Sequence, residues 1–309
     1  METPGNSIEA LGAARGARPA APPAAHPAQA HTHQLPEEPL VVIEPTRSWS
    51  PFDLKEIWAY RELLYFLTAR DIKVRYKQAA LGVAWVVLQP LMLTLVFTVF
   101  LGMLARVPSS GSTPYALFVF VGLLPWTLFS QSVTAGSTSL VANSHLITKI
   151  YFPRVLIPAA ATGARLLDFI ISLAILAALM LYYRAAPTWN VLALPLVLAV
   201  LVAFSLGVAM FASAFNVRYR DVGVVTPVVV QLWMYVSPVL YPSLLIPRQW
   251  RGLYMLNPMA GIVEGFRAAL LGGPFDWRSL GVAAAVSAAV FLLAASLFRR
   301  TERSFADTI

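Results

Sequence analysis

Six apolar stretches, separated by polar segments, divide the region between residues 84 and 298 of the chain. A helix needs about 20 apolar residues to cross a hydrocarbon core of roughly 30 Å. Each stretch reaches or approaches that length, so we expect six transmembrane helices, at residues 84–104, 115–135, 155–183, 191–215, 224–241 and 280–298. The pattern therefore predicts an all-α membrane protein whose transmembrane domain covers residues 84–300.

Two segments of different character precede the first span. Residues 1–50 hold eight of the 23 prolines and show no sustained apolar period, which predicts a disordered Pro/Ala-rich tail. Residues 51–83 alternate apolar and basic positions, which predicts an amphipathic helix or helix pair lying in the membrane interface. A simple membrane anchor that orients the first span would show the same pattern. A functional role and a purely structural role of this segment therefore both stay open.

The segment between the fifth and last spans is too polar and too broken by proline to be one span. Residues 253–256 and 259–271 nevertheless remain apolar. Irregular backbone at membrane depth is tolerated where protein or a water-filled cavity covers it. We therefore predict a pair of re-entrant helices before the last span.

Composition supports a membrane protein and excludes a soluble enzyme, because 58% of the residues are hydrophobic and only 12% are charged. The net charge of +8 reflects an uneven distribution: 16 of the 23 Lys and Arg lie on one side of the predicted spans and six on the other. The positive-inside rule places the larger group, both termini and the tail at 301–309 in the cytoplasm. The excess of Lys and Arg is therefore expected to face the anionic lipid of the inner leaflet rather than nucleic acid. The chain has no cysteine and four histidines, and no metal site is predicted.

Ionisable residues occur within the apolar segments as two pairs. Arg165 and Asp168 stand three apart near the middle of the third span, and Glu264 and Arg267 stand three apart in the second re-entrant piece. Charged groups at such depth are costly and usually pair. Either pair could be a structural ion pair, or it could contact a transported substrate.

Several motifs occur in a fixed order along the chain. The run RDIKVRYKQ at 70–78 is followed by LGVAW at 81–85, QPL at 89–91, LITKIYFPR at 146–154, NVRYRD at 216–221, SPVLYP at 237–242 and LNP at 256–258, which leads to GFR at 265–267. In this order they resemble the type-2 ABC exporter permeases that move bacterial polysaccharides such as O-antigen, capsule or teichoic acid. The resemblance covers residues 52 to about 300.

The resemblance implies a six-helix permease subunit in the bacterial cytoplasmic (inner) membrane that forms a homodimer. Each half would bind one ATP-binding cassette subunit, and a lipid-linked or growing polysaccharide would pass between the halves. The chain lacks the G-x-x-x-x-G-K-S/T phosphate loop. We therefore expect no cofactor and no enzyme activity on this chain, with ATP and Mg bound by the partner subunit.

The resemblance also implies a cytoplasmic coupling helix in the loop at 143–154. Its apolar residues could dock in a groove of the partner, although packing on the chain's own spans is an alternative. The segment around Arg218 could be a second contact, but positive-inside anchoring explains its arginines equally well. The predicted partner-coupling residues are Leu146, Thr148, Lys149, Ile150, Tyr151, Phe152, Arg154, Arg218, Arg220 and Asp221.

Channel or gate residues are predicted among polar groups at membrane depth and aromatic residues at the ends of the spans. Aromatic rings can stack on sugar rings, but interfacial aromatic belts give the same composition without a substrate. The predicted set is Trp85, Gln89, Trp126, Arg165, Asp168, Trp233, Asn257, Met259, Glu264 and Arg267.

Two other functions stay open at this point. An ion-coupled secondary transporter would work without an ATPase, but such proteins usually show internal repeats, and none is detected here. A type-2 ABC exporter of small lipids or drugs is closer to the resemblance, although the polysaccharide motifs argue against it.

Overall fold

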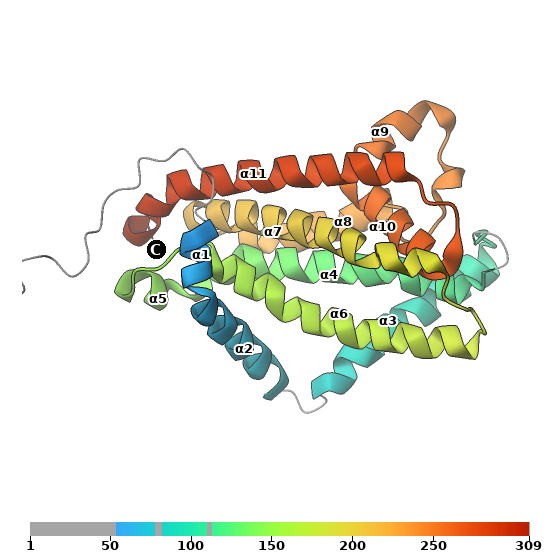
Figure 1. Cartoon of the computed structure of the whole chain (residues 1–309), viewed down its shortest axis with the longest axis horizontal. Helices are drawn as coiled ribbons and strands as arrows, with labels where there is room; N and C mark the ends of the chain where they lie inside the picture. The colour runs from blue at the N-terminus through green and yellow to red at the C-terminus, as the bar shows by residue number, and fades with distance from the viewer. Residues whose placement is uncertain (1–53, 78–81, 110–112, 309) are drawn as a thin grey trace, which may run out of the picture. The chain divides into compact units, whose positions relative to one another are not determined.

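The computed structural model describes residues 54–77, 82–109 and 113–308, and every regular element in these ranges is a helix (Figure 1). The predicted all-α class is thus confirmed for the described part of the chain. The predicted tail at 1–50 lies outside the described residues, as do residues 51–53 and 78–81 of the predicted amphipathic region.

Five of the six predicted spans are confirmed as helices long and apolar enough to cross a membrane, so the chain is a multi-pass membrane protein. The first is α3 (Gly82–Phe97), which continues as the π-helical turn η1 (Thr98–Leu104). The others are α4 (Tyr115–Ala142), α6 (Leu156–Tyr182), α7 (Leu194–Arg218) preceded by the 3-10 turn η2 (Trp189–Ala193), and α11 (Trp277–Thr308). Residues 301–308 of the predicted C-terminal tail continue α11.

The predicted fifth span is a shorter apolar helix, α8 (Val222–Val236), of 15 residues. At about 1.5 Å per residue it extends about 22 Å, less than a hydrocarbon core of roughly 30 Å. It ends five residues earlier than predicted because Ser237, which precedes Pro238, adopts an extended conformation. The ring of a proline disfavours the helical conformation in the residue before it.

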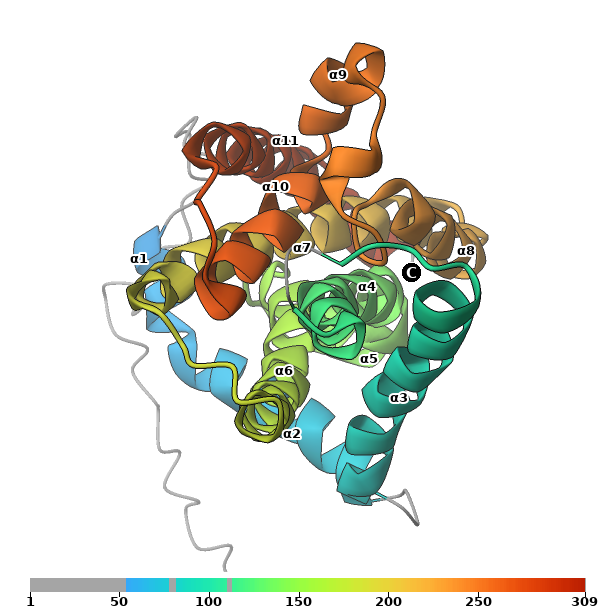
Figure 2. The same ribbon diagram turned by 90° about the vertical axis from the view of Figure 1, so that its right-hand side faces the viewer.

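Helix α4 lies at the centre of the bundle, with α3, α6, α7 and α8 around it (Figure 2). In its most apolar 18-residue window 78% of the residues are buried, against 11% in the corresponding window of α3. Glycine permits the closest approaches between helices: a Cβ on Gly136 of α4 would lie 2.5 Å from Cβ of Ala209 of α7. Helix α11 packs on the opposite side of α7, where a Cβ on Gly207 would lie 2.9 Å from Cα of Phe291.

Three short helices gather near one end of the bundle: α1 (Leu54–Ala59), α2 (Arg61–Lys77) and α5 (Ser144–Lys149) (Figure 1). A separate cluster of buried side chains connects α2 and α5 to the spans and includes Leu67, Leu140, Ile147, Phe152 and Phe298. Helix α2 packs along α6 and slants across the side of the bundle. The predicted helix pair is therefore present, while its position in the membrane interface stays a prediction.

The segment between α8 and α11 forms several short helices near the other end of the bundle (Figure 1). They are η3 (Ser243–Leu245), η4 (Arg248–Trp250), α9 (Arg251–Met255), α10 (Pro258–Arg267) and the π-helical turn η5 (Ala268–Gly272). Helix α10 is buried against α4, α7 and α11, whereas most of α9 is exposed. The two predicted apolar pieces at 253–256 and 259–271 therefore have different surroundings.

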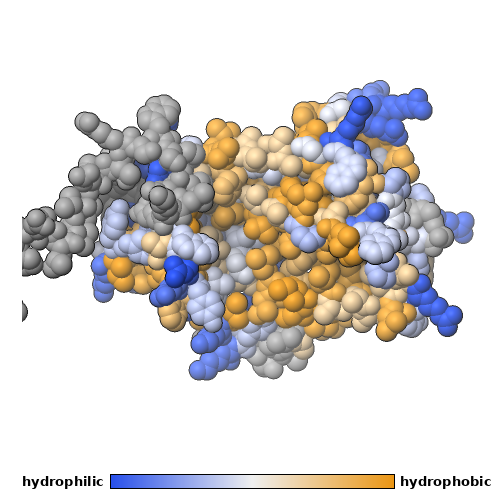
Figure 3. Space-filling view, in the orientation of Figure 1, coloured by the Kyte–Doolittle hydropathy of each residue, from blue (hydrophilic) through white to orange (hydrophobic). Residues whose placement is uncertain are grey.

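The surface distribution of side chains agrees with a membrane-embedded bundle. Figure 3 shows a broad hydrophobic band across the middle of the visible face, with hydrophilic residues toward the two ends. Such a band has the arrangement that a lipid core requires, because apolar side chains face hydrocarbon and charged ones reach water.

The close approach of α7 and α11 yields a stability prediction. In Gly207→Ala the new methyl group would collide with the backbone of α11 at Phe291. Overpacking of this kind costs about 1–3 kcal/mol, so we expect a lower thermal unfolding midpoint for the detergent-solubilised protein. Gly281→Ala in α11 is the control, because its new Cβ meets no atom within 4 Å. Equal midpoints for the two variants would contradict the packing described here.

Candidate functional site

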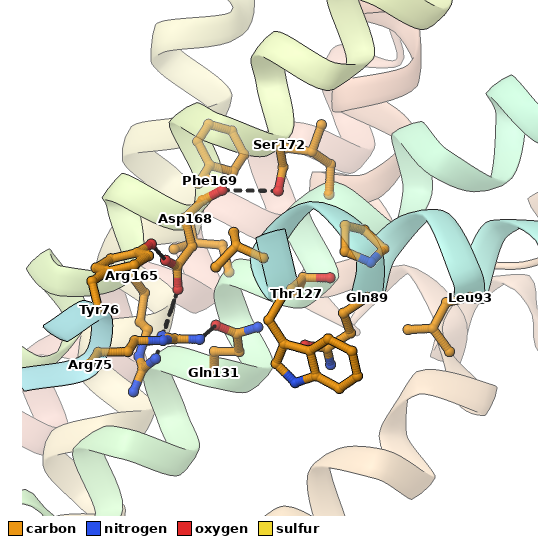
Figure 4. Close-up of a pocket in the computed structure, with 15 residues that line it drawn as sticks. Arg75, Tyr76, Gln89, Leu93, Thr127, Gln131, Arg165, Asp168, Phe169 and Ser172 are labelled. Carbon is orange, nitrogen blue, oxygen red and sulfur yellow. Dashed lines mark hydrogen bonds and ion pairs between the residues drawn. The ribbon is translucent and has the colours of Figure 1, made fainter. Parts of the chain in front are cut away.

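A small cavity lined by both polar and apolar side chains lies where α2, α3, α4 and α6 meet (Figure 4). Its volume is about 110 Å³. It is lined by Arg75 and Tyr76 of α2, Trp85, Val86, Gln89, Pro90 and Leu93 of α3, Leu124, Thr127, Leu128 and Gln131 of α4, and Arg165, Asp168, Phe169 and Ser172 of α6. Four of the ten predicted channel residues, Trp85, Gln89, Arg165 and Asp168, therefore meet at one site.

The buried carboxylate of Asp168 is the centre of the polar contacts in this cavity. Its Oδ2 lies 2.6 Å from Nη1 of Arg75 and 3.8 Å from Nη1 of Arg165. The shorter contact is a charge interaction rather than a well-aligned hydrogen bond. Two guanidinium groups thus face one carboxylate, which leaves the cluster with a surplus of one positive charge.

Two neutral side chains complete the cluster. The hydroxyl of Tyr76 donates a hydrogen bond to Oδ1 of Asp168, and Nη2 of Arg75 donates to Oε1 of Gln131 over 3.3 Å. Burial, and then the hydrogen bond to Asp168, raise the pKa of the Tyr76 phenol. The phenol therefore stays protonated and serves as a hydrogen-bond donor to the carboxylate.

The sequence anticipated the pairing of Arg165 with Asp168 but missed the nearer partner. Arg75 and Tyr76 belong to the basic helix before the first span, and nothing in their spacing indicates a contact with the middle of the third span. One feature of the sequence does indicate a missing partner: a carboxylate in an apolar span needs compensation, and Arg165 is the only cation that the span itself offers.

A second buried charged group, Arg267 at the end of α10, is 5% exposed. Its Nη2 donates a 2.7 Å hydrogen bond to the carbonyl of Val239, and its Nη1 lies 3.3 Å from Oε1 of Glu264. The guanidinium also lies 3.7 Å from the ring centroid of Phe118 in α4. Gly122 leaves the necessary space, because a Cβ there would lie 2.4 Å from the Val239 oxygen.

The predicted pair of Glu264 and Arg267 is thus present, and its contacts are within the chain. Oε1 of Glu264 also accepts a 3.4 Å hydrogen bond from the backbone nitrogen of Ser243. The pair connects α10 to α4 and to the turn that follows α8. A further role of these two residues in a channel stays a prediction.

The remaining predicted channel residues are Asn257 and Met259 at the start of α10, Trp233 of α8 and Trp126 of α4. Oδ1 of Asn257 accepts hydrogen bonds from the backbone nitrogen of Met259 over 3.1 Å and from Nε1 of Trp233 over 3.2 Å. Asn257 therefore caps the helix and connects it to α8. The rings of Trp126 and Trp233 both pack on Phe129 of α4, with centroids 5.5 and 5.4 Å away. Trp126 and Met259 are buried within the single chain. These residues therefore form part of the packing between helices.

The predicted coupling loop divides into buried and exposed residues. Tyr151 is 74% exposed, whereas its neighbour Phe152 is 4% exposed and packs in the cluster that contains Leu67 and Ile147. Thr148, Lys149 and Ile150 are exposed, and Leu146 and Arg154 are partly buried. A sequence pattern of mixed apolar and basic residues did not distinguish the residues that anchor the loop from those that face outward.

The second predicted coupling segment begins where α7 ends. Arg218, Arg220 and Asp221 are exposed, and the guanidinium of Arg218 lies 5.5 Å from the ring centroid of Tyr219. Helix α5 and the junction of α7 and α8 lie toward the same end of the bundle (Figure 1). The structure therefore presents both predicted coupling segments on one side.

Comparison with known proteins identifies relatives over most of the chain. A family model described as ABC-2 type transporter matches residues 62–271. The O-antigen export system permease protein RfbA of Myxococcus xanthus is 32% identical over 259 residues, which cover 83% of this chain and 98% of that protein. A Klebsiella pneumoniae protein of the same name is 27% identical over 80% of this chain and 95% of its own. The polysialic acid transport protein KpsM of Escherichia coli is 25% identical over 77% of this chain and 93% of its own.

The Asp168 cluster predicts a graded loss of stability. Asp168→Asn leaves Arg75 and Arg165 without a carboxylate, whereas Tyr76→Phe removes one hydrogen bond of about 1 kcal/mol. We expect Asp168→Asn to lower the thermal unfolding midpoint clearly more than Tyr76→Phe. Asp71→Asn is the matched control, because Asp71 pairs with Arg70 on the surface, where ion pairs contribute about 0–1 kcal/mol. The description of the cluster fails if the Asp168 and Asp71 variants behave alike.

The Arg267 site predicts that lysine cannot replace arginine. An ammonium group lacks the planar fork needed to reach the Val239 carbonyl and Glu264 while stacking on Phe118. We expect Arg267→Lys to increase hydrogen exchange of the α10 backbone amides and to lower the unfolding midpoint. Arg248→Lys, at an exposed position in η4, should change neither measurement. Unchanged exchange of α10 in Arg267→Lys would show that the guanidinium contacts do not secure this helix.

Proposed function

Because the chain belongs to the ABC-2 type transporter family, we propose that it is the permease subunit of an ATP-driven exporter of an O-antigen-like polysaccharide. The observation that carries this proposal is the 32% identity to the O-antigen export permease of Myxococcus xanthus over 98% of that protein's length. A polysaccharide permease from Escherichia coli also aligns over 93% of its length. The substrate would be lipid-linked or still growing as it crosses the cytoplasmic (inner) membrane.

Energy for transport would come from a separate ATP-binding cassette subunit, which would bind ATP and Mg. The chain itself contains no phosphate loop. Two copies of the permease and two ATP-binding subunits would form the complex, with the polysaccharide passing between the permeases. The exposed apolar surface of α3 is available to a second copy in this arrangement, and lipid would cover the part that the second copy does not.

The end of the bundle that carries α5 would face the cytoplasm. The exposed Lys149, Arg218 and Arg220 cluster toward that end, as the positive-inside rule requires. Both termini would then be cytoplasmic. Helix α8 with the buried turn at Val239 and Leu240 would form the fifth of six spans, and α9 with α10 would form the re-entrant pair at the outer end.

Helix α5 has the construction expected of a coupling element. Its exposed neighbours Ile150 and Tyr151 would enter a groove of the ATP-binding subunit, as apolar anchors do in helix-in-groove recognition. Ile147 of α5 and Phe152, just after the helix, are buried in a cluster that includes side chains of α4, α6 and α11. Movement of the partner would therefore reach the spans directly, and a partner that binds two permease states differently would shift their populations.

The contrast between two adjacent aromatic residues tests this proposal. Tyr151→Ala should leave the thermal stability of the permease unchanged but weaken co-purification with the ATP-binding subunit and lower transport-coupled ATP hydrolysis severalfold. Phe152→Ala should first lower stability, because truncating a buried phenylalanine costs about 3–5 kcal/mol. Tyr182→Ala is the matched control, since Tyr182 is equally exposed at the far end of α6.

The outcome also separates this function from its alternatives. If the chain transports substrate with no ATPase bound, an ion-coupled mechanism replaces the proposal. If the complex hydrolyses ATP but small lipids or drugs stimulate hydrolysis and polysaccharide does not, the substrate assignment is wrong.

A further inference from the structure

A large apolar groove lies at the end of α6 that is far from α5. Its volume is about 590 Å³. The last turns of α6, the connection to α7 and one residue of η5 form its walls, chiefly through Leu176, Met180, Leu181, Val191, Leu194 and Leu270. In water, apolar surface of this extent would be unfavourable, whereas within a bilayer it is available to a hydrocarbon chain.

The groove is built by specific contacts between the two segments that border it. Nδ2 of Asn190 donates hydrogen bonds to the carbonyl oxygens of Ala268 and Gly273, over 3.2 and 2.9 Å. Gly272 has a φ of +71°, and a Cβ there would lie 2.6 Å from the Thr188 side chain. The connection after α6 is therefore fixed against η5, and the groove exists before any ligand binds.

Among the described residues that line the groove, Arg184 is the only charged one. It follows the last turn of α6 with a φ of +55°, in a position where glycine is normally favoured. The backbone nitrogens of Arg184 and Ala185 close the helix by donating to the carbonyls of Leu181 and Met180. This C-cap fixes the backbone at the end of α6, where the side chain of Arg184 lines the groove.

The residues around Arg184 indicate the depth of this site in the membrane. Tyr182 and Trp189 are largely exposed on either side of it in the sequence. Tyrosine and tryptophan are enriched at the level of the lipid headgroups. A guanidinium at headgroup level beside an apolar groove matches the two parts of a phospholipid, a phosphate and an acyl chain.

We propose that this groove binds one acyl chain of an anionic phospholipid of the surrounding bilayer, with Arg184 contacting the lipid phosphate. The site takes a resident lipid, distinct from any transported molecule, and lies outside the Asp168 cavity and the coupling loop. Charge complementarity favours an anionic headgroup, because Arg184 lines the groove and none of the described lining residues is acidic. The proposal does not depend on the substrate or on the energy source of transport.

Native mass spectrometry of the delipidated full-length chain, titrated with phosphatidylglycerol or phosphatidylcholine, tests this site. We expect tighter retention of the first phosphatidylglycerol than of phosphatidylcholine. Arg184→Gln should weaken phosphatidylglycerol binding about fivefold, as expected for one cation near anionic lipid. Ala177→Trp, which places a ring in the groove, should reduce binding of both lipids.

Two matched variants make the test specific. Arg106→Gln changes the second described non-glycine residue with positive φ, at the end of η1, and should leave lipid binding unchanged. Ala178→Trp adds the same ring to an exposed position of α6 that does not line the groove. The proposal is overturned if the Arg184 and Arg106 variants bind phosphatidylglycerol equally. It is also overturned if Ala177→Trp disrupts self-association while lipid binding persists, because a second copy would then fill the groove.

Discussion

The burial of α4 is the constraint on which the described bundle depends. Helices α3, α6, α7, α8 and α10 all contact it, and α11 is connected to it through α7. A lipid-embedded bundle gains little from the hydrophobic effect between helices, so close packing and internal hydrogen bonds must supply the association energy. Gly122 and Gly136 of α4 provide that closeness, one beside the Val239 carbonyl and the other beside Ala209.

The buried charges occur where short helices join the spans. The Asp168 cluster connects the last turn of α2 to α6, and Arg267 connects α10 to α4 and to the turn after α8. Such groups need nearby partners, because an uncompensated charge in a low-dielectric interior is costly. They therefore specify where the short helices attach, which apolar contacts alone would leave less well defined. The cavity beside Asp168 is a by-product of one of these joints and brings four of the ten predicted channel residues together.

The sequence predicted the spans well and the short elements only in outline. Long apolar runs dictate helices in a membrane, so five spans were found with modest errors at their ends. The fifth was predicted too long because Val239 and Leu240 are apolar, although Pro238 prevents the helix from reaching them. Within the sites, the pairing of Glu264 with Arg267 can be predicted from the sequence, because residues three apart lie on the same face of a helix. Contacts of Asp168 with Arg75, and of Arg267 with Phe118, depend on tertiary packing that no local pattern encodes.

The order of residues in the two charged clusters has a consequence for biogenesis. Arg75 and Tyr76 precede Asp168, so both are already synthesised when α6 reaches the membrane. Inserting a lone charge at a helix centre costs about 2.5–3.5 kcal/mol, and Arg165 travels with Asp168 on the same helix to offset it. The amino-terminal joint can therefore close during translation, while α7 and α11 are still unmade. The Arg267 joint must wait for α10, so the two joints form at different stages of translation, and the end of the bundle that carries α10 is completed last.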